Sequence, residues 1–499
     1  MSGFIDARAV PSGTVIETDV AIVGGGAAGI SLALALAPTP LRMVMLESGG
    51  LGFDSKAQAL YSGEESGYPY LKLDASRLRY LGGSTNHWGG WSRPLSEIDF
   101  EARDWMPHSG WPFPRREIAP YFKRAQSLVE CGPFVYDHGA RWARSQGAPL
   151  PLAEGGVYTS WFQFSRMRGS VLPTHFGQRY GDDIKRIPRL SSFLHANVTA
   201  IRLAPDAGRV ERLDIATLSG KRFTLKPKLT VLACGAMENA RLLLASNDVA
   251  SQGIGNGADL VGRFFADHPI PRDTATLVVF DGQLAPFYTN NAILGSLILR
   301  ATFSPTEDFQ RRRKIPASLT TVENEVKLDE LGQAAVVTVA NVLGVDATGA
   351  RAFSTGCGME LVPDPDRRLT LSGEHDALGL PRLKLHMRVA QSNFDHYRTA
   401  LKELGRQLLA ARIGMIRLNR KSRQDWIGVM DWGNHHMGTT RMAADPKQGV
   451  VDGDCKVHGI ANLFVAGSSV FPTYGASNPT LNLVALALRL ATHVRKQFP

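Results

Sequence analysis

Two adjacent histidines and a distant asparagine are the residues of this sequence whose types could do acid–base chemistry. His435 and His436 stand in the run NHHMGTTRM, and Asn478 precedes Pro479 further along the chain. A neutral imidazole can accept a proton near neutral pH, and a side-chain amide can hold an oxygen atom in place. A metal site would need further ligands at suitable spacing, but adjacent histidines point in different directions and Asp445 is separated by a turn. The sequence therefore predicts no metal, and it leaves a general base and a structural loop as the alternatives.

A glycine turn near the start of the chain has the order expected of a dinucleotide-binding site. Residues 20–23 predict an apolar strand, residues 27–37 a helix, and residues 43–46 a second strand that ends in an acid, Glu47. Between the first strand and the helix lies G-x-G-x-x-G, supplied by Gly24, Gly26 and Gly29. Glycines let the backbone reach a pyrophosphate at a helix N-terminus, and the acid accepts hydrogen bonds from ribose hydroxyls. These residues predict NAD or FAD, and Glu47 argues against the 2′-phosphate of NADP.

Two later segments are expected to return to the same sheet. Residues 228–235 read as a buried strand ending at Gly235, with a helix over 236–246. Residues 462–467 read as another strand, and a helix is expected from Pro479 to about Val494, with proline in its first turn. A nucleotide-binding domain that closes this late must contain insertions.

Composition places the chain among ordinary globular proteins. The formal net charge is +10, yet Lys and Arg are scattered apart from the run 311–314, so no nucleic-acid module is indicated. The four cysteines lie far apart without metal or disulfide spacing, which favours a reducing compartment. No apolar run is long enough for a membrane span, and the first residues lack the apolar stretch of a signal peptide. We therefore expect a cytoplasmic protein.

Three segments together resemble the glucose-methanol-choline (GMC) family of FAD oxidoreductases. They are VGGGAAG…LESG near the start, RYLGGSTNHWGGW over residues 79–91, and the stretch from NHHMGTTRM through NLFVAGSSVFPTYGASNPTL. The second and third are most similar to the pyranose oxidase and glycoside or fructose dehydrogenase branch. The resemblance covers nearly the whole chain, but residues 265–425 carry no matching motif, so substrate specificity is expected there.

The resemblance implies an α/β fold in which a Rossmann-like FAD-binding domain is interleaved with an α+β substrate-binding domain built on an antiparallel sheet. The FAD-binding domain is expected to comprise residues 15–60, 75–95, 190–268 and 432–499. The substrate-binding domain is expected to comprise residues 96–189 and 269–431.

The resemblance also assigns roles to the residues that opened this section. His435 corresponds to the family's base, which removes the O–H proton of an alcohol while hydride passes to flavin N5, and Asn478 corresponds to its partner. The N-terminus of the helix after Asn478 would face the flavin and favour its reduced anion. The residues implied to bind the cofactor are Gly24, Gly26, Ala27, Ala28, Gly29, Glu47, Ser48, Gly83, Ser84, Asn86, His87, Trp88, Gly89, Val198, Cys234, Gly235, Gly467, Ser468, Asn478, Pro479 and Thr480.

Several points stay open at this stage. His87 occupies the place where pyranose oxidases link a histidine covalently to the flavin, but Thr85 and Asn86 before it depart from that pattern, so a hydrogen-bonding or packing role is the alternative. Residues 267–269 are a structural turn or a tie to the flavin domain, and residues 161–164 are a sugar-stacking cluster or a core strand.

The resemblance implies that the substrate is a small-molecule alcohol, a sugar or glycoside. The alternatives are an aminoglycoside or another secondary-metabolite alcohol, or a lyase whose flavin is structural. Oxygen, a quinone or a small redox partner could accept the electrons.

Overall fold

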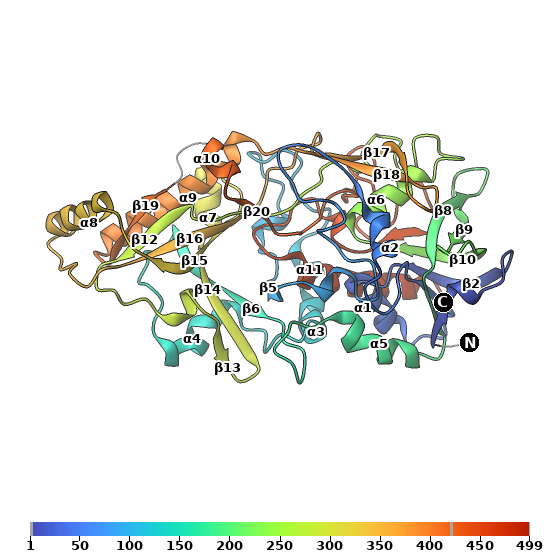
Figure 1. The fold of residues 1–499 in the computed structure, drawn as a ribbon, viewed down its shortest axis with the longest axis horizontal. Helices are drawn as coiled ribbons and strands as arrows, with labels where there is room; N and C mark the ends of the chain where they lie inside the picture. The colour runs from blue at the N-terminus through green and yellow to red at the C-terminus, as the bar shows by residue number, and fades with distance from the viewer. Residues whose placement is uncertain (1–2, 420–422, 499) are drawn as a thin grey trace.

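Two large β-sheets lie at opposite ends of an elongated molecule, as Figure 1 shows. The computed structural model describes residues 3–419 and 423–498. The N- and C-terminal ends of the chain lie in the same half, beside the first sheet. Segments far apart in sequence therefore build that half together.

The first sheet is mainly parallel and is built from apolar strands. Because both faces of a parallel sheet are covered, its central strands read as continuous hydrophobic runs, and residues 20–23 and 43–46 are indeed buried throughout. The parallel strands, in spatial order, are β1 (Gly3–Asp6), β7 (Leu190–Leu194), β3 (Met43–Leu46), β2 (Val15–Val23), β10 (Arg222–Leu232) and β21 (Leu463–Val465). An antiparallel extension from β10 adds β9 (Val210–Ala216) and β8 (Asn197–Leu203).

Helices cover this sheet, and two of them begin at the carboxyl ends of its strands. They are α1 (Ala27–Leu36), which follows β2, and α6 (Ala236–Ala245), which follows β10. The sequence predicted both within one residue at each end, which is the usual uncertainty of helix boundaries. The strands β2 and β10 start earlier than expected because their polar first halves also pair. The other helices of this half are α2 (Ser55–Gln58), α3 (Ala119–Leu128), α5 (Phe176–Arg186) and α11 (Pro479–Lys496).

The second sheet is antiparallel, with one face packed against α9 (Gln391–Ala410). Its strands, in spatial order, are β19 (Gly414–Leu418), β12 (Ala275–Val279), β16 (Arg351–Met359), β15 (Ser318–Val326), β14 (Leu297–Pro305), β6 (Val157–Phe164) and β5 (Trp91–Ser92), with β13 (Ala292–Leu294) on β14. The remaining helices of this half are α4 (Gly139–Ala143), α7 (Glu307–Arg313), α8 (Glu330–Leu343) and α10 (Arg423–Ile427). The predicted fold class, an α/β unit with an interleaved antiparallel-sheet unit, is confirmed.

Two further sheets are small. They are β17 (Arg368–His375) with β18 (Pro381–Met387) and β4 (Gly63–Gly67), and β11 (Pro269–Pro271) with β20 (Met430–Trp432). Arg241 of α6 donates to the carbonyl of Pro381 at 2.8 Å, so the β17–β18 hairpin lies beside the first sheet although the sequence division placed it in the other domain. Strand β5 lies in the second sheet although residues 75–95 were assigned to the first domain. The division itself stays a proposal.

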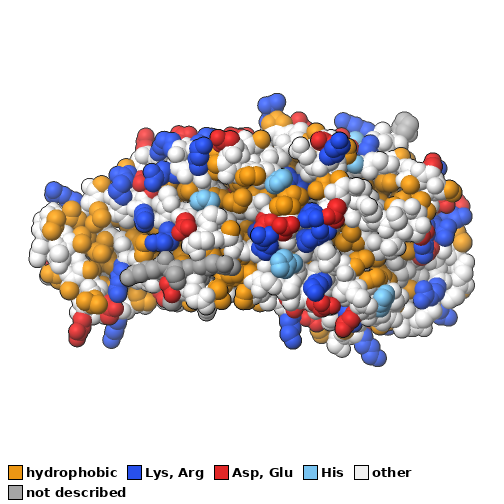
Figure 2. Space-filling model, turned by 90° about the horizontal axis from the view of Figure 1, so that it is seen from above, with side chains coloured by type: hydrophobic (Ala, Val, Ile, Leu, Met, Phe, Trp, Pro, Cys, Tyr) orange, Lys and Arg blue, Asp and Glu red, His pale blue; other side chains and the backbone are white. Residues whose placement is uncertain are grey.

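The aromatic run at residues 161–164 belongs to β6 and is buried along its whole length, as expected of a core strand. The face of the molecule seen in Figure 2 carries basic and acidic side chains interspersed. Within residues 3–419 and 423–498, no helix has both the length and the apolar character needed to cross a membrane.

Candidate active site

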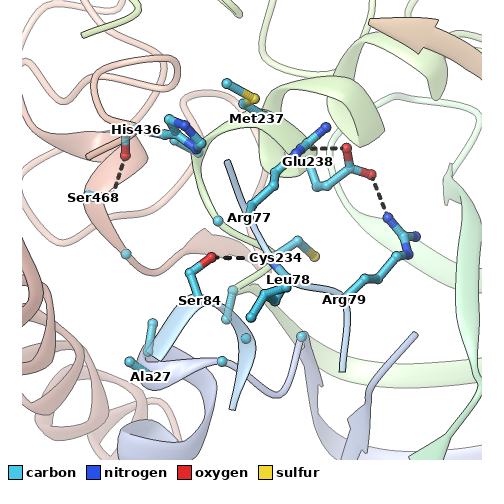
Figure 3. A pocket seen from close by; sticks show the side chains of 18 of the residues that line it. Ala27, Arg77, Leu78, Arg79, Ser84, Cys234, Met237, Glu238, His436 and Ser468 are labelled. Atoms are coloured by element: carbon cyan, nitrogen blue, oxygen red, sulfur yellow. Dashed lines mark hydrogen bonds and ion pairs between the residues drawn. The ribbon is translucent and has the colours of Figure 1, made fainter. Parts of the chain in front are cut away.

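A cavity of about 390 Å³ lies between the carboxyl ends of the parallel strands and the N-terminus of α11 (Figure 3). Most of the residues predicted to bind the cofactor line it, and so do both predicted catalytic residues. The lining residues among them are Gly24, Gly26, Ala27, Ala28, Glu47, Ser48, Gly83, Ser84, His87, Trp88, Gly89, Val198, Cys234, Gly235, His435, Gly467, Ser468, Asn478, Pro479 and Thr480.

Two of the predicted residues do not line the cavity. Asn86 turns its amide to the backbone and donates to the carbonyl of Leu81 at 3.0 Å. Gly29 lies inside α1, where a Cβ atom would stand 2.0 Å from the carbonyl oxygen of Gly24. The structure thus gives Gly29 a packing role between helix and strand, and Asn86 a role in holding its own loop.

The glycine turn leaves open space where a pyrophosphate would bind. Gly24 has a φ of +108°, and a Cβ there would lie 2.5 Å from the carbonyl of Ala233, so only glycine fits. A Cβ on Gly26, by contrast, would meet no heavy atom within 4 Å, because this residue faces the cavity. Backbone N–H groups at the start of α1 are thereby accessible to an anion. The residues present fit a dinucleotide cofactor.

Glu47 is fixed at the end of β3 by the backbone. Its two carboxylate oxygens accept from the N–H groups of Gly25 and Gly49, each at 2.8 Å. The side chain is buried and still lines the cavity, and Oε1 also accepts from Ser48 Oγ at 3.3 Å, so Oε2 is the oxygen that keeps a lone pair for a hydroxyl donor. This arrangement suits the recognition of a ribose.

A buried ion-pair network lines the cavity and was not predicted. Figure 3 shows Arg77 and Arg79 on either side of Glu238, at N–O distances of 2.9 and 3.2 Å, and Arg241 adds a third contact at 3.3 Å. Burial alone would raise the pKa of Glu238, but the three guanidinium groups outweigh it and hold that pKa at about 2. No local pattern joins residues so far apart in sequence, so the sequence carried no signal for this network.

The two predicted catalytic side chains contact each other. Nδ2 of Asn478 lies 3.1 Å from Nε2 of His435. Asn478 occupies the N-cap position of α11, yet its side chain makes no capping hydrogen bond, because its amide turns to the histidine instead. Pro479 follows in the first turn, where a missing N–H costs nothing.

A second histidine, His268, sets the protonation of the first. Its Nε2 lies 2.8 Å from the carbonyl oxygen of Gly475, which can only accept, so the proton of a neutral His268 is on Nε2. Its Nδ1 is then an acceptor, and Nδ1 of His435 at 2.9 Å must donate to it. It follows that His435 carries its proton on Nδ1 and presents an unprotonated Nε2 to Asn478. The asparagine amide is the donor in that contact.

Burial keeps these rings neutral. Burial first, and then the neighbouring His268 and His436, hold the pKa of His435 well below its usual value. Burial also lowers the pKa of His268 to about 4, although the Gly475 carbonyl opposes the shift. The backbone N–H of His435 donates to Asp267 at 2.8 Å, which anchors the segment.

Residues 267–269 therefore do more than form a turn, since His268 contacts the predicted base. His436 was expected to point elsewhere, but it too lies in the cavity wall, where desolvation lowers its pKa to about 3. Neither residue could be placed from spacing, because both act through contacts distant in sequence. In the part of the chain that the structure describes, no three His, Cys, Asp or Glu side chains gather as metal ligands.

Together, the parallel sheet with its glycine turn, the antiparallel sheet and the histidine–asparagine pair define a dinucleotide-dependent oxidoreductase. Residues 363–487 match the family model described as GMC oxidoreductase. The chain is 25% identical to the 6'''-hydroxyparomomycin C oxidase of Streptomyces lividus over 95% of its own length and 92% of that protein. It is 28% identical to the fructose dehydrogenase large subunit of Gluconobacter japonicus, over 61% of this chain and 54% of that one.

Among solved structures, pyridoxine 4-oxidase from Mesorbium loti superposes with a TM-score of 0.61 at 18% identity, covering 96% of this chain and 99% of that chain. The chain thus carries a GMC oxidoreductase C-terminal domain, and it is an FAD-dependent enzyme that acts on alcohols, as its sequence predicted.

Proposed function

We propose that this enzyme oxidises a hydroxyl group of a sugar or glycoside to a carbonyl, with His435 as the base and Asn478 as the positioning donor. The observation that carries the proposal is the unprotonated Nε2 of His435, which faces the Asn478 amide at 3.1 Å in the cavity wall. A hydroxyl group holds its proton tightly, so hydride cannot leave the carbon until a base is taking that proton.

The two side chains suit the two needs of a substrate oxygen. Asn478 donates a hydrogen bond to the oxygen, and His435 accepts the O–H proton at Nε2 while the C–H hydride leaves and the C=O bond forms. FAD, when bound, supplies the hydride acceptor. The resulting imidazolium of His435 keeps its Nδ1–H on His268, so the ring does not turn as its charge changes.

The cofactor would be held along the whole cavity. Backbone groups from Gly24 to Ala28 would bind the pyrophosphate, and Glu47 the ribose. Pro479 and Thr480 lie in the cavity wall, so the positive end of α11 would favour negative charge on the flavin. His87 also lines the cavity, and flavin that stays with acid-denatured protein would reveal a covalent link through it.

An aromatic side chain in the cavity wall supports a sugar-like substrate. Trp91 lines the cavity and packs on Phe162 and Phe164, with ring centroids 5.4 and 4.6 Å away. An aromatic ring in the wall of a cavity can pack against the apolar face of a sugar ring.

One observation favours a second candidate. A relative that the chain matches over 95% of its length is named as an oxidase of an aminoglycoside, so an aminoglycoside or another secondary-metabolite alcohol is the alternative substrate. A lyase with a non-redox flavin is the alternative chemistry.

The test is anaerobic. The purified yellow protein is mixed with free sugars, glycosides, amino sugars, aminoglycosides and simple alcohols, and flavin absorbance is followed. We expect bleaching by a neutral sugar or glycoside. Bleaching by aminoglycosides alone would move the assignment to the second candidate, and a flavin that no alcohol reduces would support the lyase.

The electron acceptor and the compartment are further parts of the proposal. Readmitting air to the bleached protein distinguishes oxygen from a quinone or a small redox partner. The four cysteines are unpaired in the structure, which supports a cytoplasmic location.

A further inference from the structure

One short loop contacts both ends of the two-histidine chain. The carbonyl of Gly475 accepts from Nε2 of His268 at 2.8 Å, and the amide of Asn478 donates to Nε2 of His435 at 3.1 Å. The two rings join between these points at 2.9 Å. A shift of the loop over residues 474–478 would therefore change the hydrogen bonding of both rings at once.

A buried carboxylate holds the backbone of this loop. Glu360 follows directly after β16 and is 1% exposed. Its Oε1 accepts from the backbone N–H groups of Tyr474 and Gly475, both at 3.0 Å. Arg103 contacts the same carboxylate at the longer distances of 3.3 and 3.5 Å, and both side chains are fully buried.

The opposite side of the loop is closed by a second carboxylate. A Cβ on Gly475 would lie 2.5 Å from Asp99, and this glycine has a φ of +56°. The loop thus runs between Asp99 and Glu360, and there is no room for a side chain at Gly475. Asp99 Oδ1 has no hydrogen-bond partner among the described residues, so it does not hold the loop as Glu360 does.

We propose that Glu360 is a positioning residue for the oxidation, because it holds the Gly475 carbonyl against His268 and so fixes the proton of His435 on Nδ1. With the carbonyl in place, His268 is an acceptor at Nδ1, and Nε2 of His435 is free for the substrate proton. Without it, His268 can carry its proton on Nδ1 and donate to Nδ1 of His435, which moves the proton of His435 to Nε2. The inference rests on the proposed role of His435 as base.

A purely structural ion pair with Arg103 is the competing explanation, and two double variants separate it from the proposed role. Glu360→Gln with Arg103→Met removes the ion pair but keeps a carbonyl oxygen that can accept from both N–H groups. Glu360→Met with Arg103→Met removes the ion pair and the acceptor. Replacing both partners of a buried pair avoids leaving one charge unpaired, so both proteins are expected to fold.

Two readouts are used on the flavin-loaded proteins. The first is ¹⁵N NMR of histidine-labelled protein, in which the ring-nitrogen shifts report the tautomer of His435, assigned by comparison with His435→Gln. The second is the limiting rate of anaerobic flavin reduction. The NMR readout needs no substrate, so it tests whether Glu360 sets the tautomer of His435 even if no sugar or glycoside reduces the flavin.

We expect the Gln/Met protein to keep the Nδ1–H signature and a rate near that of the parent. The Met/Met protein should show mixed tautomers and a reduction rate lower by about tenfold or more, with unchanged substrate affinity, since the two backbone N–H groups are left without an acceptor. Retention of the signature in the Met/Met protein, or equal losses in both proteins, would overturn the proposal.

A third variant covers the case in which the Met/Met protein does not fold. Glu360→Asp keeps the charge beside Arg103 but draws the carboxylate back by one methylene from the two N–H groups. We expect it to lose part of the Nδ1–H signature and about threefold or more of the rate. Full retention of both would equally overturn the proposal.

Discussion

Replacing His268 with phenylalanine removes the contact that sets the tautomer of His435 while keeping an aromatic ring in place. The imidazole of His268 lies edge-on to Tyr474 and to His435, with ring centroids 4.9 and 5.0 Å away. Phenylalanine can fill that space, but it offers neither ring nitrogen. The Nδ1–H of His435 then loses its acceptor, and the carbonyl of Gly475 loses its donor.

The size of the effect follows from these two contacts. Each buried group left without a partner costs about 1–3 kcal/mol, so unfolding free energy should fall by roughly 2–6 kcal/mol. The preference for the reactive tautomer of His435 rests on one such contact. Its loss should lower the limiting rate of flavin reduction roughly 5- to 150-fold, with little change in substrate affinity.

Rapid anaerobic mixing with a reducing substrate measures the limiting rate of flavin reduction and the substrate affinity. His458→Phe is the matched control, because it also removes a hydrogen bond from a histidine Nε2 to a carbonyl, that of Ala443 at 3.0 Å, away from the cavity. A His268→Phe protein that reduces at the rate of the control would refute the tautomer assignment.

Three further outcomes are expected. His435→Ala should stay folded and yellow but resist reduction by substrate, and normal turnover would contradict the role of base. Gly26→Val should fold without flavin, because its side chain would enter the open cavity, whereas Gly29→Ala should disrupt folding, since its Cβ would lie 2.0 Å from a carbonyl oxygen. Flavin absorbance and circular dichroism distinguish the two variants. Flavin retained by Gly26→Val would argue against a pyrophosphate site at the glycine turn. Thermal stability should fall as pH drops below about 6.5, because unfolded chains protonate His268 and His436 there while the folded rings, with pKa values of about 4 and about 3, do not. Each histidine should lower the free energy of unfolding by about 1.4 kcal/mol per pH unit. A melting temperature that stays constant down to about pH 5 would exclude this linkage.

How much the sequence could predict depended on whether a feature is local. The glycine turn, its flanking strands and Glu47 lie within one short segment, so their geometry follows from spacing. The pairing of His435 with Asn478 needed the family resemblance, because nothing in the spacing places two loops together. His268 could not be assigned, since its role exists only through ring-to-ring contacts. His436 was expected to point elsewhere because it is adjacent to His435, but both histidines line the cavity.

The domain division had the same limit. The hairpin of β17 and β18 is held beside the first sheet by Arg241, whose partners Asp376 and Pro381 lie far along the chain. Burial of a guanidinium among acceptors is a tertiary event without a local pattern. The sequence therefore predicted the two kinds of sheet better than it predicted which connecting segments lie against each.

The cavity wall begins at Val23 and ends at Leu483, and this span has a consequence for biosynthesis. Strand β10 can pair with β2 as soon as both have been made, but β21 can pair with β10 only after residue 465 has left the ribosome. A complete flavin cavity therefore requires the chain through Leu483, and until then the nascent chain must stay unaggregated with part of its sheet edge unpaired. Folding that depends on such distant pairings is slow, so the supply of FAD and of chaperones during synthesis should govern the yield of active enzyme.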